Sequence, residues 1–137
     1  MPRRPFILIA ACALAAALGA CDGRAIAPDE RGVCWQTAPR PSDGYVPLAN
    51  DVASLEVCAM LLEAQRLQGK ARADGAFQGY FIFVSADEIS SASHVGGWHY
   101  PILQPPQRVA IDQQLLRMIR QRGGRAPDAS ELHVEHQ

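Results

Sequence analysis

The sequence predicts a small single domain of the α+β class, in which a short, mostly antiparallel sheet of about three strands is packed by two helices. Three patterns support this prediction: a long amphipathic stripe, a run of aromatic and β-branched residues, and a second apolar stripe near the carboxyl end. The domain is expected over residues 33–124. Its predicted strands lie near residues 33–38, 77–85 and 99–103, and its predicted helices near 51–68 and 110–122.

The strongest element is the helix predicted over residues 51–68. Apolar residues recur there at steps of three and four, namely Val52, Leu55, Ala59 and Leu62. Asn50 or Asp51 is a suitable N-cap, and Gly69 follows the last turn, where glycine often ends a helix. The same stripe places Cys58 near the side that is expected to face the sheet.

The clearest strand is predicted from Phe77 to Ser85, because apolar residues occupy both of its faces. A second strand is predicted over 33–38. Residues 39–49 are rich in Pro, Gly and Asp and are predicted to form a surface loop. The run from Ser85 to Glu88 has a capping-box pattern, which predicts a short helix over about 86–92.

The last helix is predicted from an apolar stripe that includes Ile111, Leu115 and Ile119. Pro105 and Pro106 are expected to interrupt the chain between the third strand and this helix. Two glycines follow the helix, and the composition of residues 125–137 then predicts a flexible polar tail.

The amino-terminal residues are predicted to be a targeting signal. Arg3 and Arg4 precede an uncharged run of 15 residues from Phe6 to Ala20, a pattern typical of a secretory signal peptide. A membrane-spanning helix needs about 20 apolar residues, so the run is too short to serve as one. The two arginines also resemble a twin-arginine export motif, but Pro2 stands where serine or threonine is usual, which favours a plain basic start.

The apolar run ends in Leu18-Gly19-Ala20-Cys21, which resembles the lipobox of bacterial lipoproteins. The resemblance covers residues 1–22 only. It implies that residues 1–20 are a cleaved signal peptide and that Cys21 carries a covalent lipid, with residues 21–32 as lipidated cysteine and tether. Two or three acyl chains would anchor the protein in membrane lipid, since one chain holds only marginally. No other cofactor is implied. An ordinary signal peptide that ends in cysteine is the alternative.

The same resemblance also implies a location and a cysteine pairing. Asp22 resembles the inner-membrane retention signal of this class, which favours the inner over the outer membrane on the periplasmic face. Cys12 leaves with the signal and Cys21 carries lipid, so Cys34 and Cys58 remain to form a disulfide in an oxidising compartment. A metal or redox pair is the alternative, although the spacing is not Cys-x-x-Cys.

The net charge of the chain argues against a nucleic-acid partner. The whole chain has a net charge of −1, and loss of Arg3 and Arg4 would bring the mature chain to −3. That mild acidity does not match the basic surface of a nucleic-acid-binding protein, so no nucleic-acid partner is expected.

The most unusual loop runs from His94 to Pro101. Gly96 and Gly97 allow unusual backbone geometry, and three rings with polar tips follow at once. The candidate partner or ligand residues of this loop are His94, Trp98, His99 and Tyr100. The alternative is a hairpin-like turn in which Trp98 fills the core.

No motif identifies a reaction. The mature chain lacks a Gly-x-Ser-x-Gly elbow, a phosphate-binding glycine loop and a c-type haem motif, so we predict no catalytic residue and favour a protein that is not an enzyme. The leading hypothesis is a lipid-anchored, periplasm-facing accessory protein that binds another envelope protein or membrane complex. One alternative is a small envelope hydrolase or ligand-binding protein that uses the His94–Tyr100 loop, with His99 as acid or base. Another is a metal-binding lipoprotein whose ligands are drawn from His94, His99, His133 and His136.

Overall fold

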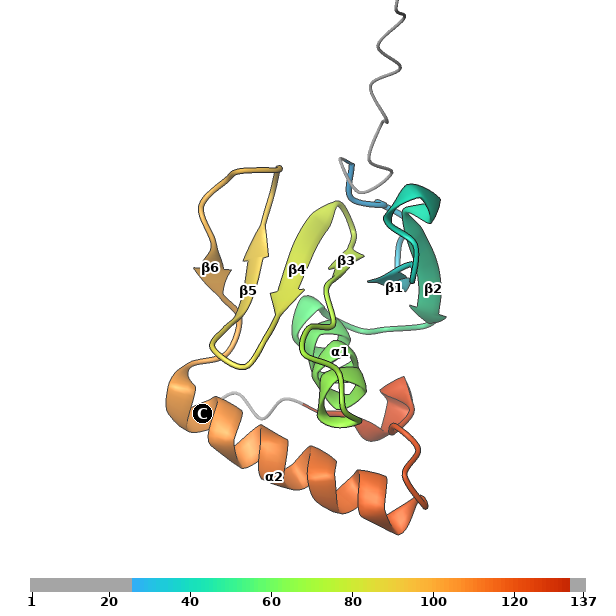
Figure 1. Cartoon of the computed structure of the whole chain (residues 1–137), viewed down its shortest axis with the longest axis vertical. Helices are drawn as coiled ribbons and strands as arrows, with labels where there is room; N and C mark the ends of the chain where they lie inside the picture. Colours follow the sequence, from blue (N-terminus) through green and yellow to red (C-terminus); the bar gives the residue numbers. More distant parts are fainter. Residues whose placement is uncertain (1–25, 134–137) are drawn as a thin grey trace, which may run out of the picture.

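Residues 26–133 are described by a computed structural model, in which six antiparallel strands form one sheet and two helices pack on it (Figure 1). The order of strands across the sheet is β2-β1-β3-β4-β5-β6. The strands are β1 (Cys34–Thr37), β2 (Tyr45–Ala49), β3 (Gly75–Phe77), β4 (Tyr80–Val84), β5 (Ile89–Ala92) and β6 (Tyr100–Pro101). The helices are α1 (Leu55–Leu67) and α2 (Pro105–Gln121), with short 3-10 turns at Pro41–Asp43 and Ala129–Glu131. The predicted signal peptide, Cys21 and His136 lie outside the described residues.

The α+β class and the two helices are confirmed, but the prediction of about three strands is wrong. The run 77–85 is divided by a tight turn at Gln78 and Gly79, whose φ values are 46° and 83°. Two consecutive residues with positive φ are typical of the turn that joins antiparallel strands, so the run belongs to two strands, β3 and β4. The segment 39–49, predicted as a loop, contains β2, and its Pro47 is tolerated because β2 is an edge strand.

The short helix predicted over 86–92 is also wrong, because those residues form a turn and then β5. The Ser85 hydroxyl accepts hydrogen bonds from the backbone N–H groups of Asp87 and Glu88, both at 3.3 Å. The Ser85 N–H in turn donates to the Glu88 carbonyl at 2.9 Å. These bonds close a turn between β4 and β5, and pairing of Ile89 with Val84 then continues the sheet. The Ser85 hydroxyl therefore makes hydrogen bonds like those of a helix N-cap, but these bonds close a turn and no helix follows.

Helix α1 lies against the sheet and supplies most of the core. It begins later than predicted, because Asp51 has a φ of 55° and Ser54 is the N-cap, its hydroxyl accepting a hydrogen bond from the Val57 N–H at 3.3 Å. Eight consecutive residues of α1, 57–64, are buried. At Gly75 a Cβ atom would lie 2.1 Å from the Trp35 carbonyl oxygen and 2.7 Å from Cδ1 of Leu62. Only glycine at this position lets α1 approach the sheet so closely.

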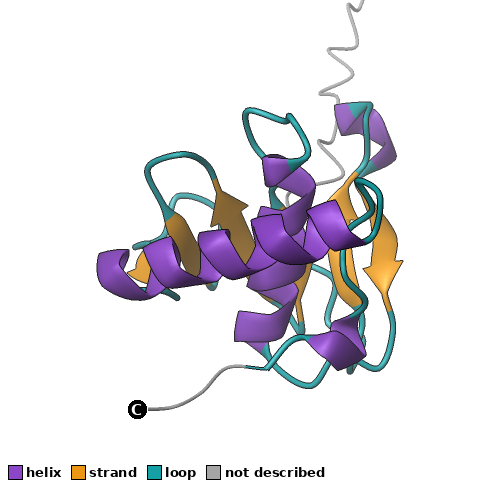
Figure 2. Ribbon diagram, turned by 90° about the horizontal axis from the view of Figure 1, so that it is seen from below, coloured by secondary structure: helices purple, strands orange, loops and turns teal. Residues whose placement is uncertain are grey.

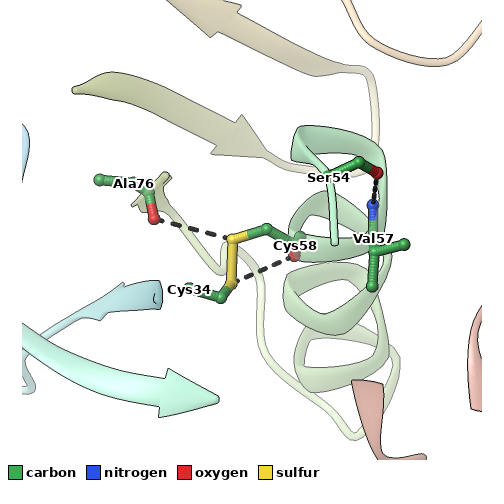
Figure 3. The surroundings of a disulfide bond; sticks show 5 residues. All are labelled: Cys34, Ser54, Val57, Cys58 and Ala76. Atoms are coloured by element: carbon green, nitrogen blue, oxygen red, sulfur yellow. Dashed lines mark hydrogen bonds between the residues drawn. A yellow bond between two sulfur atoms is a disulfide. The ribbon is translucent and has the colours of Figure 1, made fainter. Parts of the chain in front are cut away.

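The predicted disulfide between Cys34 and Cys58 is confirmed and joins β1 to α1 (Figure 3). Both cysteines are fully buried. They lie in the main core, which includes Met60 and Leu62 of α1, Ile82 and Val84 of β4, and Leu115 of α2. The bond therefore fastens the first strand to the helix at the centre of the domain.

Helix α2 begins at Pro105 rather than near residue 110. The two prolines that were expected to interrupt the chain occupy its first turn, where the backbone N–H has no partner within the helix. The N–H of Gln104 instead donates to the Gln107 side chain at 3.0 Å. Seen from below, α2 lies in front of α1, against which it packs (Figure 2).

The described part of the segment predicted as a tail packs against the domain. Leu132 is 2% exposed and belongs to the main core. The Arg122 guanidinium bonds the carboxylate of Asp128 at 3.0 Å and also pairs with Glu131. No helix within residues 26–133 is long and apolar enough to cross a membrane.

Candidate functional site

One face of the sheet is packed by α1, and the other is an aromatic surface that neither helix covers. Residues paired directly across antiparallel strands share a face. The register pairs Thr37 with Tyr45, Trp35 and Phe81 each with Ala76, and Phe83 with Ser90. These residues define what we call the open face. They lie opposite the face that carries Cys34, Phe77 and Ile82 into the main core.

The open face has its own small apolar cluster. Ala27, Ala76 and Phe81 are buried there, and Trp35, Tyr45 and Phe83 pack against them while remaining partly exposed. The backbone around Ala27 crosses to the β3–β4 turn, where the Pro28 carbonyl accepts a hydrogen bond from the Gly79 N–H at 2.8 Å. The first described residues therefore cover one part of this face and leave the rest accessible.

A hollow of about 490 Å³ lies between the open face and the loop that joins β5 to β6. Its floor is formed by the sheet and one wall by Val95, Gly96 and His99 of the loop. The sheet residues of the floor include Thr37, Tyr45, Phe81 and Phe83. The volume falls within the range that accommodates a small ligand or the side chains of a bound peptide.

His99 is held by a ring contact on one side and by polar neighbours at one ring nitrogen. Its ring stacks on Phe83, with the ring centroids 4.2 Å apart and the planes 5° from parallel. Nδ1 lies 3.2 Å from Oε1 of Glu88 and 3.3 Å from Oγ of Ser90. Nε2 has no hydrogen-bond partner within residues 26–133 and is the ring nitrogen left for a ligand.

This arrangement is a histidine–carboxylate pair and not a serine triad. In a triad the carboxylate and the serine occupy opposite nitrogens of the imidazole. Here Glu88 and Ser90 approach the same nitrogen, and Ser90 is only 3% exposed. The geometry therefore supports His99 as a hydrogen-bonding or acid–base group, while Ser90 acts only as a polar neighbour.

Of the four candidate residues in the predicted loop, only His99 lines the hollow. The loop joins the antiparallel pair β5 and β6, as the hairpin-like alternative predicts, but Trp98 is 84% exposed and does not fill the core. Tyr100 lies in β6 and pairs with Ser91, on the face opposite the hollow. The exposed His94 bonds Ser93, with 3.0 Å between Nδ1 and Oγ.

Sequence reasoning missed the contributions of Tyr45, Phe83 and Glu88 to this site. The sequence did contain a signal for Phe83, because the run from Phe77 to Ser85 is apolar on both faces. The helices cover only one face of the sheet, so the apolar residues of the other face, Phe83 among them, are left at the site. Nothing local indicated Glu88, which meets His99 eleven residues later only because β5 and β6 pair.

A second cluster of polar side chains lies between the helices. Glu63 of α1 is fully buried, and its carboxylate accepts two hydrogen bonds of 2.7 Å from Arg66 and one of 3.0 Å from Arg108 of α2. Arg108 also donates to the Ser85 carbonyl of the β4–β5 turn. The cluster therefore holds α2 against α1 and against the sheet.

The carboxyl groups of this cluster have shifted pKa values of opposite sign. Burial raises the pKa of Glu63, but hydrogen bonds from Arg66, Asp112 and Arg108 together bring it below its ordinary value. Burial and the adjacent Glu63 raise the pKa of Asp112 to about 6. Oδ1 of Asp112 is buried without a hydrogen-bond partner in the described part of the chain. With two arginines committed to Glu63, we assign the cluster a structural role.

Comparison with family models, with curated proteins and with solved structures found no match for this chain. No group of three histidine, cysteine or acidic residues within 26–133 is placed to hold a metal ion. The candidate site is therefore defined by the open face, its hollow and His99.

Proposed function

We propose that this protein is a lipid-anchored, periplasm-facing interaction protein that binds another envelope protein or membrane complex through the open face of its sheet. The anchor part of the proposal rests on the signal-like residues 1–20 and the lipobox-like Leu18-Gly19-Ala20-Cys21. The binding part rests on one observation: the helices pack on one face of the sheet and leave an aromatic hollow on the other.

The chemistry of the hollow suits a protein partner. The centres of protein interfaces are enriched in aromatic side chains and poor in charge. Tyr45, Phe81, Phe83 and His99 provide such a surface, and Asp74 is the one carboxylate among the residues that line the hollow. A partner side chain placed in the hollow would remove water from apolar area on both molecules, which stabilises a complex by roughly 25 cal/mol per Å².

The binding surface is tested by a substitution that fills the hollow. Thr37→Arg adds a long charged side chain to the floor of the hollow. Gln113→Arg introduces the same side chain on the exposed side of α2 and serves as the control. We expect a stoichiometric partner to co-purify from detergent-solubilised membranes with wild type and Gln113→Arg, and to be lost from Thr37→Arg. Absence of any such partner across several growth conditions, or equal loss from both variants, would contradict the proposal.

The anchor is tested separately by Cys21→Ser. We expect this variant to keep the mass of the uncut precursor, because the thiol that carries the lipid is absent. Mass spectrometry of the membrane fraction measures both processing and acylation. A Cys21→Ser protein that is acylated and cut as wild type is would refute the anchor.

The His99–Glu88 pair supports a second candidate function, a hydrolase or small-ligand binder that uses the same hollow. A carboxylate on Nδ1 orients an imidazole so that Nε2 exchanges protons with a ligand. In this case, His99→Ala and Glu88→Gln both reduce turnover of an acyl-ester panel, while Ser90→Ala preserves it. Hydrolysis that is unchanged by His99→Ala would exclude the pair as its source.

A further inference from the structure

Four of the seven large hydrophobic side chains that are exposed within residues 26–133 lie at one end of the sheet. The large hydrophobic residues exposed within 26–133 are Ile26, Tyr80, Val95, Trp98, Tyr100, Val109 and Leu116. Figure 1 shows the first described residues, the β3–β4 turn and the β5–β6 loop at the same end of the sheet, with α2 at the opposite end. Ile26, Val95 and Trp98 belong to these segments, and Tyr80 follows the β3–β4 turn as the first residue of β4.

This end is also the end nearest to the proposed anchor. Five residue steps separate Ile26 from Cys21. A fully extended chain spans at most about 3.6 Å per residue, so the Cα atom of Ile26 lies within about 18 Å of that of Cys21. If Cys21 carries lipid, the end of the sheet with Ile26 is held within that distance of the bilayer surface.

The chemistry of the β5–β6 loop matches the interfacial zone of a bilayer. Tryptophan is enriched there because its ring is apolar while its N–H still finds polar partners. Trp98 is 84% exposed and Val95 65%, and the loop from Ser93 to His99 contains no Asp, Glu, Lys or Arg. The arginines at the end of α2, among them Arg117 and Arg120, lie at the other end of the molecule.

We propose that the β5–β6 loop rests in the headgroup region of the membrane with Trp98 inserted, at the same end of the sheet as Ile26. This inference depends on the lipid anchor of the proposed function. Contact at two places, the acyl chains and the loop, fixes the orientation of the domain on the bilayer. The hollow beside the loop then opens close to the membrane surface, which favours a membrane-embedded complex as its partner.

The test uses the full lipidated protein in vesicles of phosphatidylethanolamine and phosphatidylglycerol that contain brominated lipid, which quenches nearby tryptophan fluorescence. Trp35 is the second tryptophan and packs on the open face against Ala27, so the Trp98→Tyr variant measures the quenching of Trp35 alone. We expect the fractional quenching of wild type to exceed that of Trp98→Tyr at least about twofold. The quenching should persist in 0.5 M salt, where the screening length is only about 4 Å. An apolar contact does not depend on the charges that such salt screens.

Each outcome separates this inference from the anchor. Equal quenching of wild type and Trp98→Tyr in a protein that mass spectrometry shows to be acylated overturns the loop contact and leaves the anchor intact. A protein without acyl groups overturns the proposed function instead. Trp98 fluorescence that is not quenched by brominated lipid and that shifts only when membrane extract is added indicates that a protein covers the loop, which also overturns this inference.

Discussion

At the scale of single residues, Glu63 has the most demanding environment in the domain. Its side chain is fully buried, and the two guanidinium groups that contact it come from α1 and α2. Removing one partner from a buried ion pair leaves the remaining charge without compensation, which is more costly than the pair is stabilising.

Glu63→Gln is therefore expected to lower the free energy of unfolding by about 3–5 kcal/mol, because Arg66 and Arg108 would both lose the buried carboxylate that they contact. Urea denaturation followed by tryptophan fluorescence measures the loss. Glu56→Gln makes the same change in the first turn of α1, outside the cluster, and should cost well under 1 kcal/mol. Equal effects of the two substitutions would show that the cluster does not stabilise the fold.

Only one of the two contacts that Glu63 makes with arginines could be predicted from the sequence. The pair of Glu63 and Arg66 follows from the three-residue spacing that places side chains on one side of a helix. Arg108 lies 45 residues further along the chain and reaches Glu63 only because α2 packs on α1. A glutamate on a predicted helix is ordinarily solvated, so nothing local distinguished Glu63 from Glu56.

At the scale of elements, α2 depends on polar contacts more than α1 does. Only Leu115 and Ile119 are buried among its 17 residues. Asp112 lies 3.8 Å from the Arg108 guanidinium, and its side chain is 25% exposed. The protonation of Asp112 therefore bears on how firmly α2 is held.

Asp112→Asn is expected to change the pH dependence of stability. The pKa of Asp112 rises from an ordinary 3.8 to about 6, so between these values the folded protein holds a proton that the unfolded chain has lost. The resulting stabilisation is complete below pH 4 and is lost as the pH rises through 6. Relative to wild type, Asp112→Asn should become more stable by about 1–2 kcal/mol between pH 4 and pH 7, allowing for its solvent exposure.

Thermal unfolding of both proteins at pH 4, 5, 6 and 7 measures this difference. Asp87→Asn, on the exposed β4–β5 turn, is the control and should follow wild type across the series. A constant difference between Asp112→Asn and wild type at all four pH values would contradict the shifted pKa.

The elements also show why the strand count was underestimated. The β3–β4 turn uses Gln78 with positive φ, where asparagine or aspartate would have signalled a turn. β2 contains a proline, and β5 follows a capping-box pattern that predicts a helix, so neither was predicted as a strand. Both strands are stabilised by pairing with a neighbour, β2 with β1 and β5 with β4, rather than by their own composition.

At the scale of the whole molecule, the disulfide links the two layers. Cys34 and Cys58 enclose 23 residues that include β2 and the start of α1. Closing a loop of that length restricts the unfolded chain and contributes about 3–4 kcal/mol. A domain of this size has a total stability of roughly 5–15 kcal/mol, so the bond is a large part of it.

Replacing both cysteines by alanine is expected to lower the free energy of unfolding by about 3–4 kcal/mol. Denaturation in the presence and absence of a reductant measures the same loss in the wild type, while the double variant should not respond to the reductant. A wild-type protein whose unfolding midpoint is unaffected after complete reduction would show that the bond adds no stability.

The amino-acid sequence by itself determined the α+β class and the two amphipathic helices, and it predicted the pairing of Cys34 with Cys58 that the structure shows. These features depend on local periodicity or on cysteine count. The tertiary structure alone decided that the sheet has six strands, that Glu63 meets Arg108, and that His99 stacks on Phe83 beside an open hollow. Each of these depends on contacts between segments far apart in the chain, which form only when the strands pair and one face of the sheet is buried.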